Sequence, residues 1–146
     1  LAVLHRCRQD VGTTTEFSEQ SLENSTRSRV PYSIGKAKAN LAREAGRRND
    51  LAEAESLSHA ALELMPSAYP FRWAALWPLL GVSVHQNSLT TARACAVQLL
   101  DLSQQRLPDD MTTALQQTSE ITGALTPAND RQWSLPVKIA ASFGYL

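Results

Sequence analysis

The chain has 146 residues, of which 43% are hydrophobic and 19% are charged, and its 14 basic residues balance its 14 acidic ones. This length and composition are typical of one globular domain with a sizeable core. A neutral chain has no overall attraction to nucleic acid or to a membrane surface, so neither is expected as a partner. The richest apolar run, over residues 73–84, is shorter than the ~18 residues that a membrane span needs.

The predicted helices come in pairs that repeat about every 38–40 residues. Leu1-Ala2 aligns with Leu41-Ala42, and Pro31-Tyr32 aligns with Pro70-Phe71. The first of these copies is partial, and the later ones hold two helices each. In chain order, the sequence predicts helices over Leu1–Arg8, Val11–Ser28, Pro31–Arg47, Asp50–Met65, Pro70–His85 and Ser88–Arg106.

Local signals mark where these helices begin. Pro31 and Pro70 suit a first helical turn, where the missing N–H is not needed. Asp50 with Glu53 three residues later has the spacing of a capping box. Pro78 lies inside a predicted helix, so we expect either a kink there or a helix that starts late.

Small residues recur where paired helices would cross, at Ala42, Ala54, Gly81 and Ala92. A small side chain lets two helix axes approach, and larger neighbours then interdigitate around it. The residue pattern therefore predicts an all-α protein built from antiparallel helix pairs.

The C-terminal part departs from the repeat. A helix starting near Pro108 is expected to cap the repeats, so that residues 1–125 form the helical domain. We expect residues 126–146 to be an irregular tail with room for a short helix. This tail either folds back, with Trp133, Phe143 and Tyr145 covering apolar surface, or is simply the end of the chain.

Residues 35–66 resemble a tetratricopeptide repeat. Leu41-Ala42 stands at the usual Leu-Gly/Ala pair, and Ala54, Ala61 and Pro66 stand at the small residues and the proline of the second helix. The long period is similar to that of C-terminal regions of bacterial adenylate/guanylate cyclases and LuxR-type ATPase regulators. The resemblance implies a right-handed α-α superhelix in a signalling protein. Because the chain has no cyclase or ATPase motif, such an activity would lie outside it.

The basic residues cluster, with seven of the 14 between positions 27 and 48. Gly35-Lys36 is not a P-loop, because the upstream glycine is missing and Ala37 follows. Lys36, Arg43 and Arg47 share one helical stripe, which we expect to face outward. The resemblance implies that this stripe lines a concave groove, where it would bind an acidic segment or a chain-end carboxylate. The alternative is a solvated face with ordinary salt bridges.

The sequence contains no recognisable catalytic or metal site. No nucleophile elbow is present, and Cys7, Cys95 and the histidines His5, His59 and His85 have no metal-ligand spacing. We therefore expect neither enzymatic activity nor a cofactor. The two scattered cysteines favour a reduced, cytoplasmic chain in which they are small buried side chains. The chain starts without Met, and we expect it to be a piece of a longer protein.

Two functional hypotheses remain, besides a purely structural spacer. The first is a module that mediates protein–protein interaction or regulates an adjoining signalling domain. The second is a small-molecule effector domain with a pocket near Trp73, Trp77 and Tyr32. Two tryptophans four residues apart on a helix are also typical of ordinary core packing.

Overall fold

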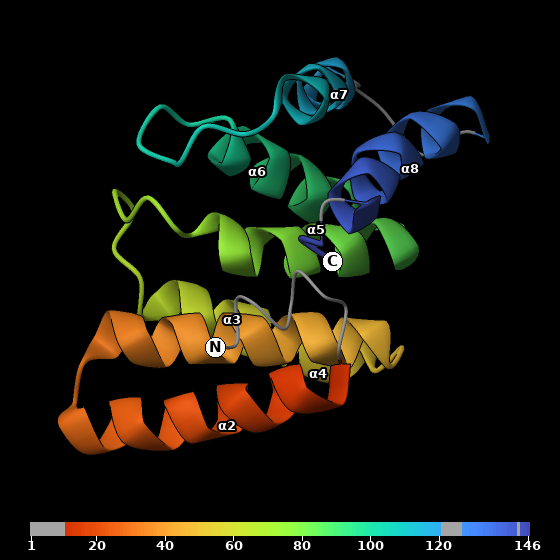
Figure 1. Ribbon diagram of the computed structural model, residues 1–146. Coiled ribbons are helices and arrows are strands. Elements are labelled where there is room, and N and C mark those ends of the chain that lie inside the picture. Colours follow the sequence, from red (N-terminus) through yellow and green to blue (C-terminus); the bar gives the residue numbers. More distant parts are fainter. Residues whose placement is uncertain (1–10, 121–126, 143) are drawn as a thin grey trace.

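The computed structural model describes residues 11–120, 127–142 and 144–146, and in this part of the chain every regular element is an α-helix (Figure 1). This confirms the all-α class. The expected partial helix over Leu1–Arg8 lies outside the described residues. The helices are α2 (Val11–Ser28), α3 (Pro31–Arg47), α4 (Leu51–Glu63), α5 (Trp73–His85), α6 (Leu89–Leu99), α7 (Asp109–Ser119) and α8 (Pro127–Ser142).

The same tight turn joins three pairs of successive helices. It contains one residue with positive φ: Arg29 (55°) between α2 and α3, Asn49 (62°) between α3 and α4, and Asn87 (58°) between α5 and α6. In each turn the next N–H bonds to a carbonyl five residues back, as from Asp50 to Ala45. This is the Schellman arrangement, which satisfies the last carbonyls of a helix. Asn tolerates the left-handed conformation better than most residues, so the two asparagines suit their positions.

Helix starts follow the predicted signals in part. The bounds of α2 and α3 are those predicted, and α3 begins at Pro31. The Asp50 carboxylate accepts a hydrogen bond from the Glu53 N–H at 3.1 Å, which confirms the N-cap of α4. The Glu53 side chain pairs instead with Arg48 at 3.1 Å. Helix α5 begins at Trp73, later than the predicted start at Pro70, and Pro78 still lies inside it.

Helix α6 is shorter than predicted. It ends at Leu99, and the segment up to Arg106 is a loop. This loop is tied to the one before α5, because the Gln105 N–H donates to the Pro70 carbonyl at 2.9 Å and the Gln104 side chain donates to the Tyr69 carbonyl. These two hydrogen bonds hold the loop against the segment before α5. They would be lost if α6 continued as a helix to Arg106.

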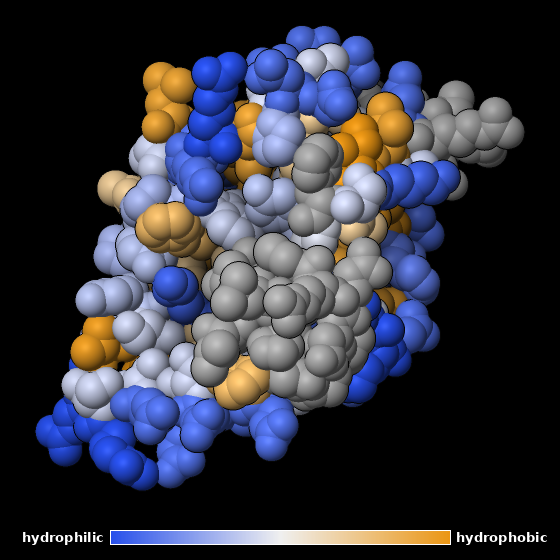
Figure 2. Space-filling view, in the orientation of Figure 1, coloured by the Kyte–Doolittle hydropathy of each residue, from blue (hydrophilic) through white to orange (hydrophobic). Residues whose placement is uncertain are grey.

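Helix α3 is surrounded, because it packs against α2, α4 and α5. Its approach to α4 is close at Gly35, where an added Cβ would lie 3.0 Å from the Ala61 carbonyl oxygen. The small residues at the predicted crossings, Ala42, Ala54 and Ala92, are fully buried. The outer side of α2 carries charged residues, and the lower edge of the molecule in Figure 2 is accordingly hydrophilic.

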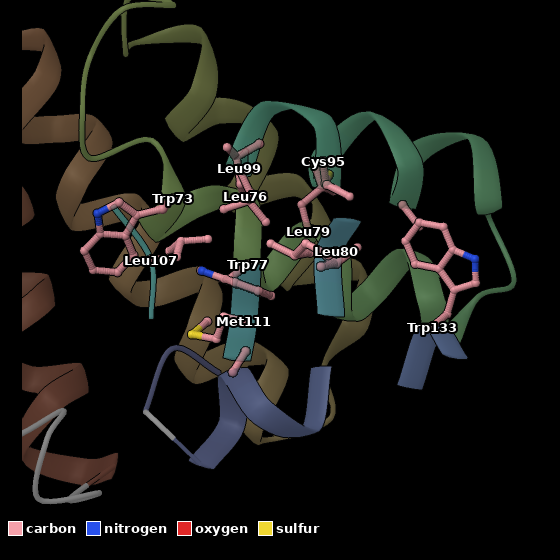
Figure 3. Close-up of a cluster of buried hydrophobic side chains, with 14 residues drawn as sticks. Trp73, Leu76, Trp77, Leu79, Leu80, Cys95, Leu99, Leu107, Met111 and Trp133 are labelled. Atoms are coloured by element: carbon pink, nitrogen blue, oxygen red, sulfur yellow. The ribbon is translucent and has the colours of Figure 1, made fainter. Parts of the chain in front are cut away.

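The main core surrounds α5, which is apolar on almost every side (Figure 3). Trp77 and Leu80 meet side chains of α6, of α7 and of α8 in one cluster. That cluster includes the fully buried Trp133, which belongs to α8. The C-terminal segment is therefore not an irregular tail, because a helix of 16 residues completes the core. Its burial confirms that Trp133 folds back onto apolar surface, whereas Phe143 lies outside the described residues.

We predict that α8 is integral to the fold. Trp133→Ala should lower the free energy of unfolding by about 3–5 kcal/mol, since it removes a large buried side chain and leaves a cavity. Leu135→Ala is the matched control on the same helix, because Leu135 is 45% exposed, and it should cost less than about 1 kcal/mol. Urea denaturation followed by circular dichroism measures both values. Equal effects of the two substitutions would contradict the prediction.

Candidate functional site

The predicted site residues line a groove between α3 and α5. On α3 the lining side chains are Lys36, Asn40, Arg43 and Arg47, at spacings of four, three and four. On α5 the facing positions have the same spacings and form a second stripe parallel to the first. We call this the α3–α5 groove, with α5 contributing Ala74, Pro78, Gly81 and His85.

Two hollows lie along this groove. The first, the Lys36 pocket, has a volume of about 320 Å³ and is lined by Lys36, Asn40, Trp73 and Tyr145 among others. The second, the Arg47 pocket, has a volume of about 220 Å³, and its lining includes Arg43, Arg47, His85 and Leu146. The predicted stripe thus borders both hollows, with Lys36 in the lining of the first and Arg43 and Arg47 in the lining of the second.

The groove is basic at both ends. The Lys36 ammonium lies 5.6 Å from the centre of the Phe71 ring, which is a cation–π distance. Lys36 and Arg47 are exposed. The described residues that line the two pockets include no aspartate or glutamate. An anionic ligand in the groove would meet Lys36 at one end and Arg47 at the other.

Arg43 differs from its prediction, because it is 3% exposed and does not face outward. Its guanidinium pairs with the carboxylate of Glu44, which is also buried. The cause is the position of α3, whose neighbours α2, α4 and α5 cover most of its surface. Arg43 still borders the Arg47 pocket, but its charge is largely neutralised by its neighbour.

Trp77 and Trp73 have different roles. Trp77 is fully buried in the main core, which confirms its predicted packing role. Trp73 borders the Lys36 pocket, and its indole N–H donates to the Gln105 side chain at 3.2 Å. Tyr32 is half exposed and lies against Tyr69, with ring centroids 5.8 Å apart. Trp73 therefore belongs to the main core and also borders the Lys36 pocket, whereas Trp77 and Tyr32 line neither hollow.

Asn40, Tyr145 and Leu146 are among the lining residues that the sequence did not predict. Asn40 lies four residues after Lys36 on the same helix, so the stripe itself could have identified it. Tyr145 and Leu146 come from the end of the chain, and no local pattern indicates where such a segment folds. They enter the groove because α8 directs the chain back toward α5.

The remaining candidates have structural roles or exposed positions. Cys95 is buried, and burial raises the pKa of its thiol to about 12, so the thiolate is scarce. His59 and His85 are exposed on different helices. Among the described residues, no group of three His, Cys, Asp or Glu side chains is placed to hold a metal ion. Cys7 and His5 lie outside the described residues.

No family model matches the chain, and neither a curated protein nor a solved structure is significantly similar to it. None of the helices in the described residues has the length and apolar character to traverse a bilayer.

The buried pair on α3 yields a stability prediction. Glu44→Ala should lower the free energy of unfolding by about 3–5 kcal/mol, because it removes the carboxylate that pairs with the buried Arg43. The double variant Arg43→Met/Glu44→Leu should cost much less, since apolar residues of similar volume replace both charges. Urea denaturation of the two variants measures the difference. A double variant as unstable as the single one would contradict the assignment.

The same pair sets a pH dependence. Burial raises the pKa of the Glu44 carboxyl above its ordinary value of 4.5, while the positive charges of Arg43, Arg47 and Arg48 act in the opposite direction. The folded state therefore binds this proton more tightly than the unfolded state does. Proton binding at Glu44 therefore favours the folded state; this contribution is fully present below pH 4.5 and is lost as the pH rises through the raised pKa. Relative to the double variant, the wild-type free energy of unfolding should decline over that interval.

Proposed function

We propose that the chain is a non-catalytic helical-repeat module that binds an acidic segment of a partner protein in the α3–α5 groove. By this binding it would mediate a protein–protein interaction or regulate an adjoining signalling domain. The observation that carries the proposal is the placement of the exposed Lys36 and Arg47 on one face of α3, beside hollows whose described lining contains no aspartate or glutamate. Carboxylates form charge-assisted hydrogen bonds with such cations.

The dimensions of the groove suit an extended peptide. Lys36 and Arg47 are 11 positions apart, which corresponds to about 16 Å along a helix axis. An extended chain covers this distance in about five residues, since each adds roughly 3.3 Å. A short segment with carboxylates near both ends could therefore reach both cations at once.

The wider repeat architecture is part of the same proposal. The turns at Asn49 and Asn87 are alike, and each leads into a helix with a buried alanine three residues after its first residue, Ala54 and Ala92. This regularity favours a tetratricopeptide-like solenoid with a right-handed superhelix. We propose a cytoplasmic setting on the basis of the low cysteine content, two residues far apart in the sequence.

The first test is binding of a capped acidic hexapeptide, Glu-Asp-Ser-Ser-Asp-Glu. Wild-type protein should bind it weakly, and the affinity should fall between about 0.1 and about 1 M salt, as the Debye length shortens from ~10 to ~3 Å. Lys36→Ala/Arg47→Ala should weaken binding roughly fivefold, because each exposed ion pair contributes about 0.2–1 kcal/mol. Isothermal titration or fluorescence anisotropy measures the affinity.

The matched control is Arg93→Ala/Arg106→Ala. It removes the same formal charge from exposed positions outside the groove, so it corrects for general attraction to a basic protein. Arg43 is left unchanged in both variants because its loss would disturb the buried pair. Equal weakening by the control and the groove variant would overturn the proposal.

A second candidate is a small-molecule site in the Lys36 pocket. Its support is the combination of one cation, the Asn40 amide and the aromatic residues Trp73 and Tyr145 around about 320 Å³. This combination fits a planar aromatic anion. An indole carboxylate should raise the thermal midpoint of the wild type in proportion to its occupancy, and Lys36→Ala should abolish the rise. A rise that persists in the variant would exclude this site.

A further inference from the structure

The α3–α5 groove is occupied by the chain itself. Helix α8 ends at Ser142, and Gly144 in the turn that follows has a φ of 74°. The Gly144 N–H bonds to the Ala141 carbonyl at 3.0 Å and the Tyr145 N–H bonds to the Ala140 carbonyl at 2.9 Å, which is the same turn that joins the earlier helices. The chain is thereby directed between α3 and α5, where its C-terminal end lies in Figure 1.

Tyr145 and Leu146 rest on α5. The Tyr145 ring lies 4.9 Å from the Trp73 ring at an edge-on angle of 79°, and 6.1 Å from the Trp77 ring. Leu146 packs on Gly81, where a Cβ would lie only 3.4 Å from the Leu146 Cδ2. The centre of the groove therefore accepts one aromatic side chain followed by one aliphatic side chain.

The occupied centre lies between the two basic ends. Tyr145 borders the Lys36 pocket and Leu146 borders the Arg47 pocket. Both side chains are only partly buried, and hollows remain beside each of them. Their segment follows the end of α8, which is anchored in the core independently through Trp133.

We propose that Tyr145–Leu146 is a displaceable internal ligand, which holds the place of a partner segment with an aromatic and an aliphatic residue flanked on both sides by carboxylates. This inference rests on the proposed function and specifies its partner. A carboxylate before the aromatic residue would meet Lys36, and one after the aliphatic residue would meet Arg47. These ionic contacts would strengthen binding of the partner segment. The chain's own segment is favoured instead by the high effective concentration that results from its tether beside the groove.

The test compares two capped peptides that differ only at their centre, Glu-Asp-Tyr-Leu-Asp-Glu and Glu-Asp-Ser-Ser-Asp-Glu. Each is titrated against the wild type and against Tyr145→Ser/Leu146→Ser. The emptied groove should bind the Tyr-Leu peptide about tenfold more tightly than the wild type does. A tenfold change corresponds to a groove that is open for about a tenth of the time in the wild type. The Ser-Ser peptide should change little.

A second variant preserves both side chains. Gly144→Val opposes the positive φ of the turn, because a β-branched residue is strained there, and so it releases the segment without removing Tyr145 or Leu146. It should also strengthen binding of the Tyr-Leu peptide. Leu135→Ser, at an exposed position of α8, is the control and should not. Circular dichroism confirms that each variant is folded.

The outcomes separate the two proposals. Salt-sensitive binding that depends on Lys36 and Arg47 but is equal in the wild type and both released variants would leave the proposed function standing and overturn the internal ligand. Equal gains for the Tyr-Leu and Ser-Ser peptides would also overturn it, since the centre would not select side chains. If neither peptide binds any folded variant, both proposals are wrong.

Discussion

The close packing of α3 among three helices is the constraint on which the rest of the structure depends. Gly35 lets the α3 backbone approach the Ala61 carbonyl of α4, and the fully buried alanines of both helices keep the axes near each other. Larger side chains at these positions would separate the helices and expose the space between them. The same packing brings α5 against α3, so the distance between the two groove walls depends on how closely these helices pack.

The helices themselves were largely predictable, because their signals are local. Proline at a helix start and an aspartate N-cap act within one turn, and α3 and α4 form nearly where these signals place them. The end of α6 was not predictable in this way. The Gln105 N–H bonds to the Pro70 carbonyl, a partner from a distant loop, and this competes with continued helix.

The sequence predicted that the candidate site residues share one helical stripe, but it did not predict which of them would be buried. Helical spacing places Lys36, Arg43 and Arg47 on one face whatever surrounds the helix. Whether a residue on that face is solvated depends on how many neighbours the helix has, and the sequence indicated only one helix partner clearly. Arg43 was therefore expected in solvent and is found buried beside Glu44. The groove segment Tyr145–Leu146 depends on the path of α8, which has no counterpart in the repeat.

The burial of Arg43 has a consequence for what the groove selects. Because Arg43 at the centre of the stripe is buried and paired with Glu44, the exposed cations of the stripe are those at its two ends, Lys36 and Arg47. The centre is bounded by Trp73, Pro78 and Gly81, which offer apolar surface and close backbone approach. A ligand that is charged along its whole length would have to desolvate its central charged groups, which would find no ionic partner there. This distribution favours a segment with carboxylates at its two ends and apolar side chains at its centre. The Tyr145–Leu146 pair in the groove is an example of such an apolar centre.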